Sequence, residues 1–537
     1  MSMSTPAAAV VCSGLSFAWP DGTAVFDDLS LAIGPGRTGL IGVNGSGKST
    51  LLRLIAGELT PAAGSVTISG ELAYLPQNVA LDPRLRVEQA LGIAPVRRAL
   101  KAIEAGEATE ENFALVGDDW DIEQRSRAEL DRLGLERVSP EQRIGELSGG
   151  ESVLLCLAAR LVGRPDVLLL DEPTNNLDPA ARQRFYQAVG AWGSTMVIVS
   201  HDRALLELVD QVADLRSGGM RWYGGTFSAY QEALAVEQEA AERRVRVAES
   251  DLRRQQRELA EARVKLDRRT RTGQKAFENK RRPKAVMMNR KQQAEVSAGK
   301  LRTMHVEKVE EAKNRLDEAE EAVRADGEIR VELPETSVPA GRTVLTMSSV
   351  ELVHGARAEL DVRGPERIAL VGGNGAGKST LLRTIAGELQ PVSGEVQVAV
   401  GMRYLPQQLD LLDESASVVR NVARFAPGAT ENTIRARLAR FLFRGRRADQ
   451  EVGTLSGGER FRATLAALLL AEPPPQLFLL DEPTNNLDLA SLRQLSAALK
   501  SYRGALIVVS HDLSFLRELG LTRWLRLDGE LTGIDPL

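Results

Sequence analysis

The stretch GVNGSGKSTLLRLIAGEL, from Gly42 to Leu59, returns almost unchanged as GGNGAGKSTLLRTIAGEL, from Gly372 to Leu389. Such self-similarity within a chain of 537 residues indicates an internal duplication. Both stretches hold the pattern GxxxxGK[ST], in which glycines let backbone N–H groups crowd around phosphate oxygens. The duplicated stretch therefore predicts two phosphate-binding loops, each followed by a helix.

Other motifs also occur twice and place the boundaries of the repeats. LSGGE begins at Leu147 and Leu455, DEPTNNLD at Asp171 and Asp481, and SHD at Ser200 and Ser510. The spacing between motifs leaves 22 extra residues in the first copy, within residues 81–146. We expect a first repeat over residues 1–230, a linker over 231–330 and a second repeat over 331–537.

Apolar runs that end in polar residues predict the fold class. The runs before Glu172 and Asp202 are short and uncharged, which is typical of buried parallel strands with polar groups at their carboxyl ends. Segments such as STLLRLIAGEL from Ser49 favour helices. Alternating strands and helices predict an α/β fold with nucleotide-binding loops at the strand ends.

Residues 236–326 have a different composition, rich in Glu, Arg, Lys, Gln and Ala with almost no glycine. Two heptad patterns flank a break that contains Gly273 and Pro283; their apolar positions are Val245, Leu252, Leu259 and Leu266, then Val309, Leu316 and Val323. This pattern predicts an antiparallel α-helical coiled-coil hairpin. Arms of roughly 35 residues would extend about 50 Å.

The glycine-rich loops assign roles to their polar residues. Lys48 and Lys378 are placed for the β- and γ-phosphate oxygens of ATP, and the hydroxyls of Ser49 and Ser379 for Mg²⁺. The residues expected to bind ATP here are Gly42, Asn44, Gly45, Ser46, Gly47, Lys48, Ser49 and Thr50, with Gly372, Asn374, Gly375, Ala376, Gly377, Lys378, Ser379 and Thr380 in the second repeat.

The Asp-Glu pairs at the ends of apolar runs supply two kinds of carboxylate. Asp171 and Asp481 are candidate Mg²⁺ ligands, whereas Glu172 and Glu482 are candidate bases that polarise the attacking water. The chain has only four histidines, and two of them, His201 and His511, follow equivalent apolar runs. We expect both to contact the γ-phosphate as donors or geometric sensors.

LSGGE followed by a helix offers a serine hydroxyl, glycine N–H groups and a helix N-terminus, which together form an anion-binding site. With this motif, both repeats resemble ATP-binding-cassette (ABC) domains over nearly their whole length, and all motifs stand in the order of that family. The resemblance implies that the signature of one repeat covers the nucleotide of the other. Ser456 and Gly458 would then complete the site of Lys48, and Ser148 and Gly150 that of Lys378.

The resemblance also implies roles for residues without a distinctive pattern of their own. Gln77 and Gln407 match the Q-loop glutamines that contact Mg²⁺, and Trp19 matches the aromatic residue that stacks on adenine. The second repeat has no aromatic at that place, so His354 is its weak substitute and adenine affinity there is in doubt.

Composition excludes several classes of protein. A content of 43% apolar and 26% charged residues is that of a globular protein, and no apolar run reaches the ~18 residues that cross a bilayer. The two cysteines lack disulfide or zinc spacing, and the first residues do not resemble a secretory signal. We expect a cytoplasmic monomer, not inserted in a membrane, with an intramolecular cassette sandwich.

Tandem cassettes, the DEPTNNLD motifs and the charged linker resemble the ABC-F subfamily, whose members act on the ribosome. That subfamily usually has His where Asn176 and Asn486 stand. Charge points the same way: Arg263–Arg302, which we call the basic segment, carries 14 Lys or Arg against three acids, while the whole chain has a net charge of −5. This segment predicts a polyanionic partner, for which ribosomal RNA and tRNA are the candidates.

Within the basic segment we expect Arg281, Arg282 and Lys284 to hold RNA phosphates. Our hypothesis is that cassette closure places the hairpin toward the tRNA and the peptidyl-transferase region, to protect ribosomes from antibiotics or to modulate translation. A solvated helix face is the alternative for the charges. For the chain, the alternatives are the ATPase subunit of a transporter with a separate permease and, less favoured, a DNA-repair ATPase.

Overall fold

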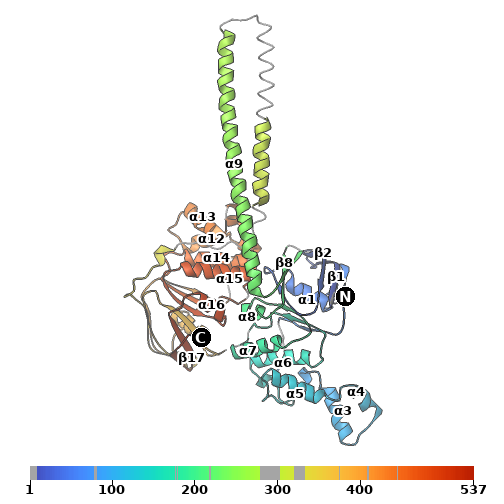
Figure 1. Cartoon of the computed structure of the whole chain (residues 1–537). Coiled ribbons are helices and arrows are strands. Elements are labelled where there is room, and N and C mark those ends of the chain that lie inside the picture. The colour runs from blue at the N-terminus through green and yellow to red at the C-terminus, as the bar shows by residue number, and fades with distance from the viewer. Residues whose placement is uncertain are drawn as a thin grey trace. The chain divides into compact units, whose positions relative to one another are not determined.

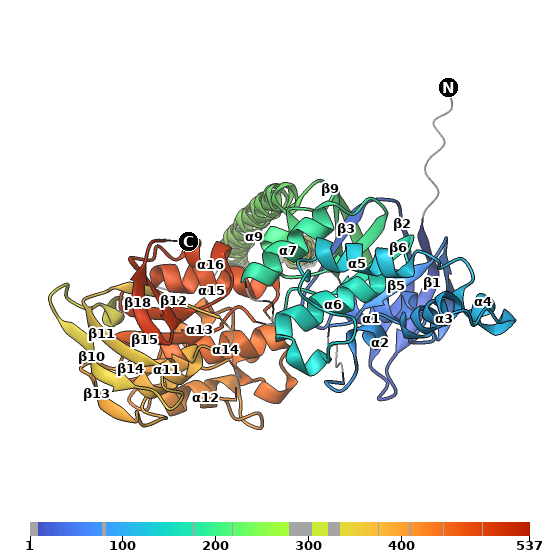
Figure 2. The same cartoon turned by 90° about the horizontal axis from the view of Figure 1, so that it is seen from below.

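The computed structural model describes residues 9–77, 82–175, 177, 179–216, 219–278, 303–319, 333–373, 375–407, 410–443, 445–485 and 487–536. Its contacts divide the chain into two units. One comprises Met1–Ala229 together with Glu328–Leu537, and the other, which we call the helical unit, is Tyr230–Gly327. Figures 1 and 2 show the elements of both units in two views.

The first repeat is built from two sheets. The strands are β1 (Val10–Ala18), β2 (Ala24–Ile33), β3 (Arg37–Ile41), β4 (Ala63–Ile68), β5 (Leu72–Leu75), β6 (Val167–Asp171), β7 (Thr195–Val199), β8 (Gln211–Arg216) and β9 (Gly219–Gly224). An antiparallel sheet has the order β2-β1-β4, and a second sheet has the order β5-β6-β7-β3-β8-β9. The strands from β5 to β8 are parallel, as the short apolar runs predicted.

The helices of the first repeat are α1 (Lys48–Ile55), α2 (Val87–Ala90), α3 (Ala94–Glu104), α4 (Glu110–Val116), α5 (Ile122–Arg132), α6 (Gly149–Leu161), α7 (Pro179–Gly190) and α8 (Arg203–Leu206). The extra residues of this repeat form α3 and α4, which lie between α2 and α5. Arg97 fastens this insertion, because its guanidinium forms ion pairs of 2.6, 2.6 and 2.5 Å with Glu88, Glu123 and Glu141.

The second repeat has the same order of elements but one continuous sheet. Its strands are β10 (Thr343–Glu351), β11 (Arg357–Arg363), β12 (Arg367–Val371), β13 (Ser393–Val398), β14 (Met402–Leu405), β15 (Leu477–Asp481), β16 (Ala505–Val509), β17 (Arg523–Asp528) and β18 (Glu530–Ile534). A single pairing, Arg357 with Glu530, joins the antiparallel strands to the parallel ones.

The helices of the second repeat are α11 (Lys378–Ile385), α12 (Val418–Phe425), α13 (Glu431–Arg440), α14 (Gly457–Leu469), α15 (Leu489–Ser501) and α16 (Leu513–Glu518). Side chains of β15 alternate between two cores. Phe478 and Leu480 pack with residues of α14 and α15, while Leu477 and Leu479 pack with residues of α11. Both faces of the parallel sheet are therefore covered by helices, which explains why its strands are uniformly apolar.

The helical unit contains most of α9 (Phe227–Glu278), a helix of 52 residues, and a helix over residues 303–319 (Figure 1). The two helices are in contact, since Arg315 Nη2 lies 3.0 Å from Asp251 Oδ2, and both residues stand 32 positions from Pro283. Helix α9 starts nine residues before the expected position 236. At about 1.5 Å per residue it measures about 78 Å, more than we expected of an arm.

None of the heptad positions whose side chains are described is exposed in the helical unit. Val245, Leu252 and Leu259 are half-buried, and Ala262 and Ala312 are buried, at 9% and 1% exposure. Small residues at the seam let the two backbones approach closely. The apolar repeat thus predicted the packed faces correctly where they are described; Val323 lies outside the described residues.

Candidate active sites

Each phosphate-binding loop connects a buried strand to a helix, β3 to α1 in the first repeat and β12 to α11 in the second. Gly47 and Gly377 precede the helices with φ of 95°, a left-handed conformation that glycine adopts without strain. A Cβ on Gly42 would lie 2.4 Å from the carbonyl oxygen of Leu215. The local backbone therefore requires glycine at these positions. The predicted loop residue Asn374 lies outside the described residues.

The loop lysines are buried and bonded to their own loops. Lys48 Nζ donates to the carbonyl oxygens of Gly42, at 2.9 Å, and Val43, at 3.1 Å, and Lys378 repeats this with Gly372 and Gly373 at 2.9 and 3.0 Å. Burial lowers the pKa of both lysines, against the effect of nearby carboxylates that favours the charged form. Phosphate oxygens are natural replacements for these carbonyl acceptors.

The residues expected at Mg²⁺ lie together in both repeats. Ser49 Oγ donates to Asp171 Oδ1 at 3.1 Å, and Ser379 Oγ to Asp481 Oδ1 at the same distance. Neighbouring ligands of an octahedral Mg²⁺ are about 2.9 Å apart, and the ion prefers oxygen donors, so these pairs fit it. Gln77 and Gln407, the remaining candidate Mg²⁺ ligands, each line the cavity of their repeat.

Two tyrosines that our sequence reasoning missed also touch the candidate metal ligands. Tyr74 Oη donates to Asp171 Oδ2 at 3.4 Å, and Tyr404 Oη to Asp481 Oδ2 at 3.1 Å. A signal was present in the sequence, since YLPQ ends at Gln77 and again at Gln407. These hydroxyls fix the second oxygen of each carboxylate and thereby orient the first toward Ser49 or Ser379.

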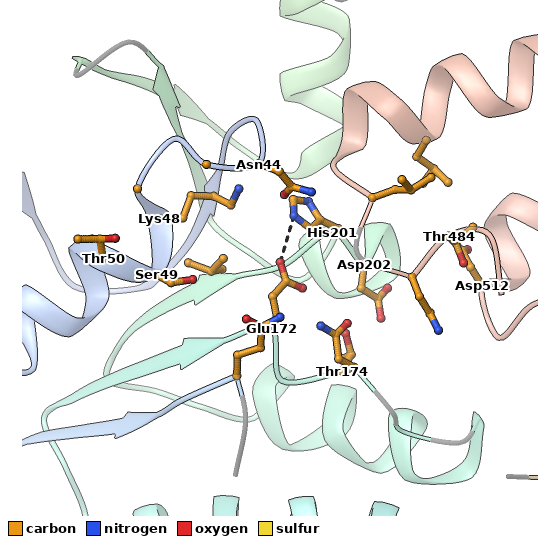
Figure 3. Close-up of a pocket in the computed structure, with 18 of the residues that line it drawn as sticks. Asn44, Lys48, Ser49, Thr50, Glu172, Thr174, His201, Asp202, Thr484 and Asp512 are labelled. Atoms are coloured by element: carbon orange, nitrogen blue, oxygen red, sulfur yellow. Dashed lines mark ion pairs between the residues drawn. The ribbon is translucent and has the colours of Figure 1, made fainter. Parts of the chain in front are cut away.

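The glutamate and histidine of each repeat form a close pair. Glu172 Oε1 lies 3.2 Å from His201 Nε2, as Figure 3 shows, and Glu482 Oε1 lies 3.3 Å from His511 Nε2. Both glutamates have φ of 46°, an unusual value for a residue with a side chain. Such strain in both repeats is typical of residues that are held for function.

Burial determines the charge state of this pair. Desolvation raises the pKa of Glu172 to about 8 and that of Glu482 to about 7, although the lysine of each site opposes the shift. Desolvation also lowers the pKa of His201 to about 3. Without nucleotide, burial therefore favours the neutral form of both Glu172 and His201.

The predicted residues of the first repeat converge on a cavity of about 400 Å³ (Figure 3). Predicted residues that line it are Trp19, Asn44, Gly45, Gly47, Lys48, Ser49, Thr50, Gln77, Glu172 and His201. Ser46 belongs to the same loop, with a buried hydroxyl that has no hydrogen-bond partner within the described part of the chain. The rings of Trp19 and Phe17 pack edge-on, with their centroids 5.1 Å apart. The Trp19 ring also lines the cavity, where it is available to the adenine base.

The second repeat forms a matching cavity of about 390 Å³. It is lined by the predicted residues His354, Gly375, Gly377, Lys378, Ser379, Thr380, Gln407, Glu482 and His511. Gly372 and Ala376 belong to the same loop, and a Cβ on Gly372 would lie 3.6 Å from that of Ala376. The exposed His354 therefore lies where adenine was expected, but with a smaller ring than Trp19 presents.

The signature residues do not line either cavity in the described conformation. Ser148 and Ser456 instead cap α6 and α14, where their hydroxyls accept from the N–H groups of Glu151 and Glu459. Gly150 and Gly458 are buried in the first turns of the same helices. Their assignment to the opposite nucleotide stays a prediction for a closed state.

Residues of the DEPTNNLD motif of the second repeat reach the first cavity instead. Thr484, Asn485 and Leu487 line it, and Asp488 Oδ2 accepts from the backbone N–H of Asn44 at 3.0 Å. The carboxylate of Asp488 is thus hydrogen-bonded to the phosphate-binding loop, through an N–H group that is suited to a phosphate oxygen.

Comparisons with known proteins identify the family of this chain. The ABC transporter family model matches residues 26–175 and 356–485. The "Tylosin resistance ATP-binding protein TlrC" of Streptomyces fradiae is 35% identical over 92% of both chains. The "ATP-binding cassette sub-family F member 3" of Rattus norvegicus is 30% identical over 95% of this chain and 70% of its own. The chain belongs to the ABC-F subfamily.

Other relatives support the same assignment. The "Probable ATP-binding protein YheS" of Escherichia coli K12 is 33% identical over 92% of this chain and 75% of its own. Two solved structures share the fold. An "RNase-L Inhibitor" has a TM-score of 0.56 and 20% sequence identity, and the match covers 95% of this chain and 88% of that chain. The archaeal factor aABCE1 has a TM-score of 0.54 and 19% identity, and the match covers 97% of this chain and 90% of that chain. This ABC-F protein is an ATPase, as its two P-loop repeats predicted.

The described part of this ABC-F protein contains no helix that is long and apolar enough to span a membrane. The residues predicted to bind RNA, Arg281, Arg282 and Lys284, lie outside the described residues, as do the two asparagines of DEPTNNLD that depart from the subfamily's usual histidine. The predicted RNA contacts and the departure from the subfamily's histidine are therefore known from the sequence alone.

Proposed function

We propose that this ABC-F ATPase acts on the ribosome, and that closure of its repeats on ATP places the basic segment against RNA. The observation that carries the proposal is the concentration of charge. The basic segment holds a net charge of about +11, so the rest of the chain is about −16. An otherwise acidic protein would be repelled by RNA phosphates everywhere except at this segment, which therefore sets the orientation of binding.

The two nucleotide sites supply the driving reaction in this proposal. Lys48 and Lys378 exchange their loop carbonyl partners for phosphate oxygens, and Glu172 and Glu482 accept a proton from the attacking water. The serine, aspartate and glutamine of each site would hold Mg²⁺, which would supply positive charge to neutralise the phosphates. His201 and His511 keep each glutamate oriented until the γ-phosphate is in place.

Closure brings Ser148 and Ser456, with the glycines that follow them, onto the nucleotide of the opposite repeat. In the described conformation Asp488 holds the N–H group of Asn44. ATP competes with that carboxylate for the loop, so nucleotide binding and rearrangement of the two repeats are one event. The chain then acts as a monomer, because both halves of each site belong to it.

The outcome on the ribosome is either protection from an antibiotic or modulation of translation. The name of TlrC records resistance to tylosin for that relative, and we extend resistance to this chain as a proposal. The apolar residues Phe277, Val286, Met287 and Met288 within the basic segment suit the drug-binding or peptidyl-transferase region rather than a phosphate surface.

Co-sedimentation with ribosomes over a series of salt concentrations tests the proposal. The triple variant Arg281→Glu, Arg282→Glu, Lys284→Glu should bind at least tenfold more weakly, and its remaining binding should depend less on salt because fewer counterions are released. The matched control changes Arg244, Arg246 and Arg257, which are exposed on α9 outside the basic segment, to glutamate. Equal loss in both variants would show that only net charge matters.

A second variant separates anchoring from effect. Phe277→Ala, Met287→Ala, Met288→Ala should sediment with ribosomes like the parent, yet abolish growth in the presence of ribosome-targeting antibiotics or the effect on translation. Co-purification of the parent with membranes instead of ribosomes would favour the transporter alternative and overturn the proposal.

A further inference from the structure

Arg182 stands at a position where the two repeats differ in chemistry. It lies in α7, in the first turn, and the spacing of DEPTNNLD makes Leu492 of α15 its counterpart. Leu492 lines the first cavity, whereas Arg182 lines both cavities. The same position of each repeat therefore faces the cavity of the other repeat. The first repeat presents the cation of Arg182 to the second cavity, whereas the second repeat presents the apolar side chain of Leu492 to the first.

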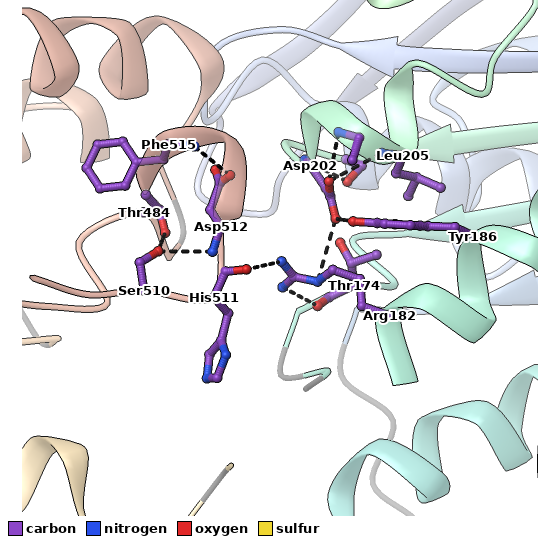
Figure 4. A network of polar contacts seen from close by, with 12 residues as sticks. Thr174, Arg182, Tyr186, Asp202, Leu205, Thr484, Ser510, His511, Asp512 and Phe515 are labelled. Atoms are coloured by element: carbon purple, nitrogen blue, oxygen red, sulfur yellow. Dashed lines mark hydrogen bonds and ion pairs between the residues drawn. The ribbon is translucent and has the colours of Figure 1, made fainter. Parts of the chain in front are cut away.

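The guanidinium of Arg182 joins segments from both repeats, as Figure 4 shows. Its Nη1 donates to the carbonyl oxygen of His511 at 3.0 Å, and its Nη2 donates to that of Thr174 at 3.3 Å. Its Nε lies 3.7 Å from Asp202 Oδ2. Only 19% of the side chain is exposed, so these charge-assisted contacts are weakly screened by solvent.

The segments that Arg182 joins all carry candidate catalytic residues. Thr174 follows Glu172 by two positions, Asp202 follows His201, and His511 is itself the candidate sensor of the second site. Asp202 is held from its other side by Tyr186, whose hydroxyl donates to Oδ2 at 2.5 Å. Arg182 is thus fixed on the first repeat and reaches the second through a single backbone carbonyl.

We propose that Arg182 is a positioning residue for the second ATP site, where it holds His511 in register with Glu482 and makes turnover depend on the first repeat. The second repeat supplies no cation to the first site from the matching position, because Leu492 stands there. The two sites of the chain are therefore coupled in one direction. The inference rests on the proposed roles of Glu482 and His511 and is independent of the ribosome.

The test measures ATP turnover of the full chain with one site silenced at a time. In the Glu172→Gln background, which leaves the second site, Arg182→Leu should lower kcat about tenfold, the scale of one charge-assisted hydrogen bond, and leave KM for ATP within twofold. In the Glu482→Gln background, where Arg182 also lines the cavity, the same change should lower kcat by a clearly smaller factor. Arg182→Lys, which keeps the charge and one donor, should restore part of the loss.

Arg203→Leu is the matched control, since Arg203 also pairs across the repeats, with Glu518, is 13% exposed and has Leu513 as its counterpart. It lines neither cavity, so it should affect both backgrounds equally or not at all. If a silenced background does not turn over, photo-labelling with azido-ATP followed by cleavage in the linker assigns trapped nucleotide to each repeat. Equal effects of Arg182→Leu on both sites, or none on the second, would overturn the proposal; absence of turnover in the parent would instead refute the assignment of the sites.

Discussion

Glu172 Oε1 lies 3.2 Å from His201 Nε2, and burial favours the neutral form of both side chains in the absence of nucleotide. The protonated form of this candidate base is therefore favoured beside its histidine. A divalent cation bound by Ser49 and Asp171 would favour the carboxylate form of Glu172 instead.

The double variant Glu172→Gln, Glu482→Gln should lose at least 100-fold in kcat while it still binds ATP. Glutamine keeps the shape of each side chain but cannot accept a proton. Steady-state ATPase assays and nucleotide binding measure the two effects. A double variant with near-normal turnover would contradict the assignment of the bases.

The same variant makes a prediction about stability and pH. The folded protein raises the pKa of Glu172 from 4.5 to about 8 and that of Glu482 to about 7, so stability from these groups is fully present below pH 4.5 and is lost as pH rises to about 8. Without nucleotide or metal, the variant should melt several degrees above the parent at pH 8.5 and at the same temperature at pH 5. Thermal unfolding at both pH values checks this, and an equal difference at both would argue against buried, protonated glutamates.

Ser148→Arg should impair turnover at the site of Lys378, and Ser456→Arg at the site of Lys48, because each signature is expected to cover the opposite nucleotide. Ser148→Ala and Ser456→Ala are controls, since the lost helix cap costs about 1 kcal/mol in either variant. Trapping of labelled nucleotide in each repeat measures the effect. Loss confined to the repeat that carries the mutation would rule out composite sites.

Trp19→Ala should weaken ATP binding at the first site about tenfold, because an aromatic ring that stacks on a base contributes about 1–3 kcal/mol. His354→Trp should strengthen binding at the second site, where the cavity holds no larger ring. Titration with a fluorescent ATP analogue in Lys378→Ala and Lys48→Ala backgrounds isolates each site. Unchanged affinity in both variants would mean that the base binds elsewhere.

Arg97→Met should loosen the insertion of α3 and α4, since three carboxylates lose their shared cation. The cost should be about 1–3 kcal/mol, reduced from that of a fully buried pair because Glu123 and Glu141 are half-exposed. Hydrogen exchange of amides in α3 and α5 measures it. Arg84→Met, whose exposed side chain pairs with Asp82, serves as the control and should leave exchange unchanged.

Much of each site could be predicted because its chemistry is local in sequence. Lys48 and Ser49 share one helix turn, and Asp171 and Glu172 end one strand, so their side chains meet as soon as the strand and helix form. Tyr74 and Tyr404 escaped prediction, although they recur, because their contact with the aspartates depends on which strands become neighbours in the sheet.

For the hairpin arm, too, the sequence predicted the packed face, but only the tertiary structure gave the full length of the helix. Heptad positions such as Leu252 and Leu259 identified the packed face, since burial follows from helical geometry alone. The start of α9 at Phe227 did not follow, because Phe227 and Tyr230 are buried by tertiary packing and lie outside the heptad pattern.

The sequence by itself determined that this protein has two P-loop repeats, each with candidate phosphate, metal and base residues, because those motifs act over a few consecutive positions. Only the tertiary structure decided which residues of one repeat reach the other. The contacts of Arg182 with His511 and of Asp488 with Asn44 join positions 329 and 444 residues apart. Contacts over such separations depend on the packing of whole sheets and helices, and in the case of Arg182 the repeat itself gave no guide, since its counterpart is a leucine.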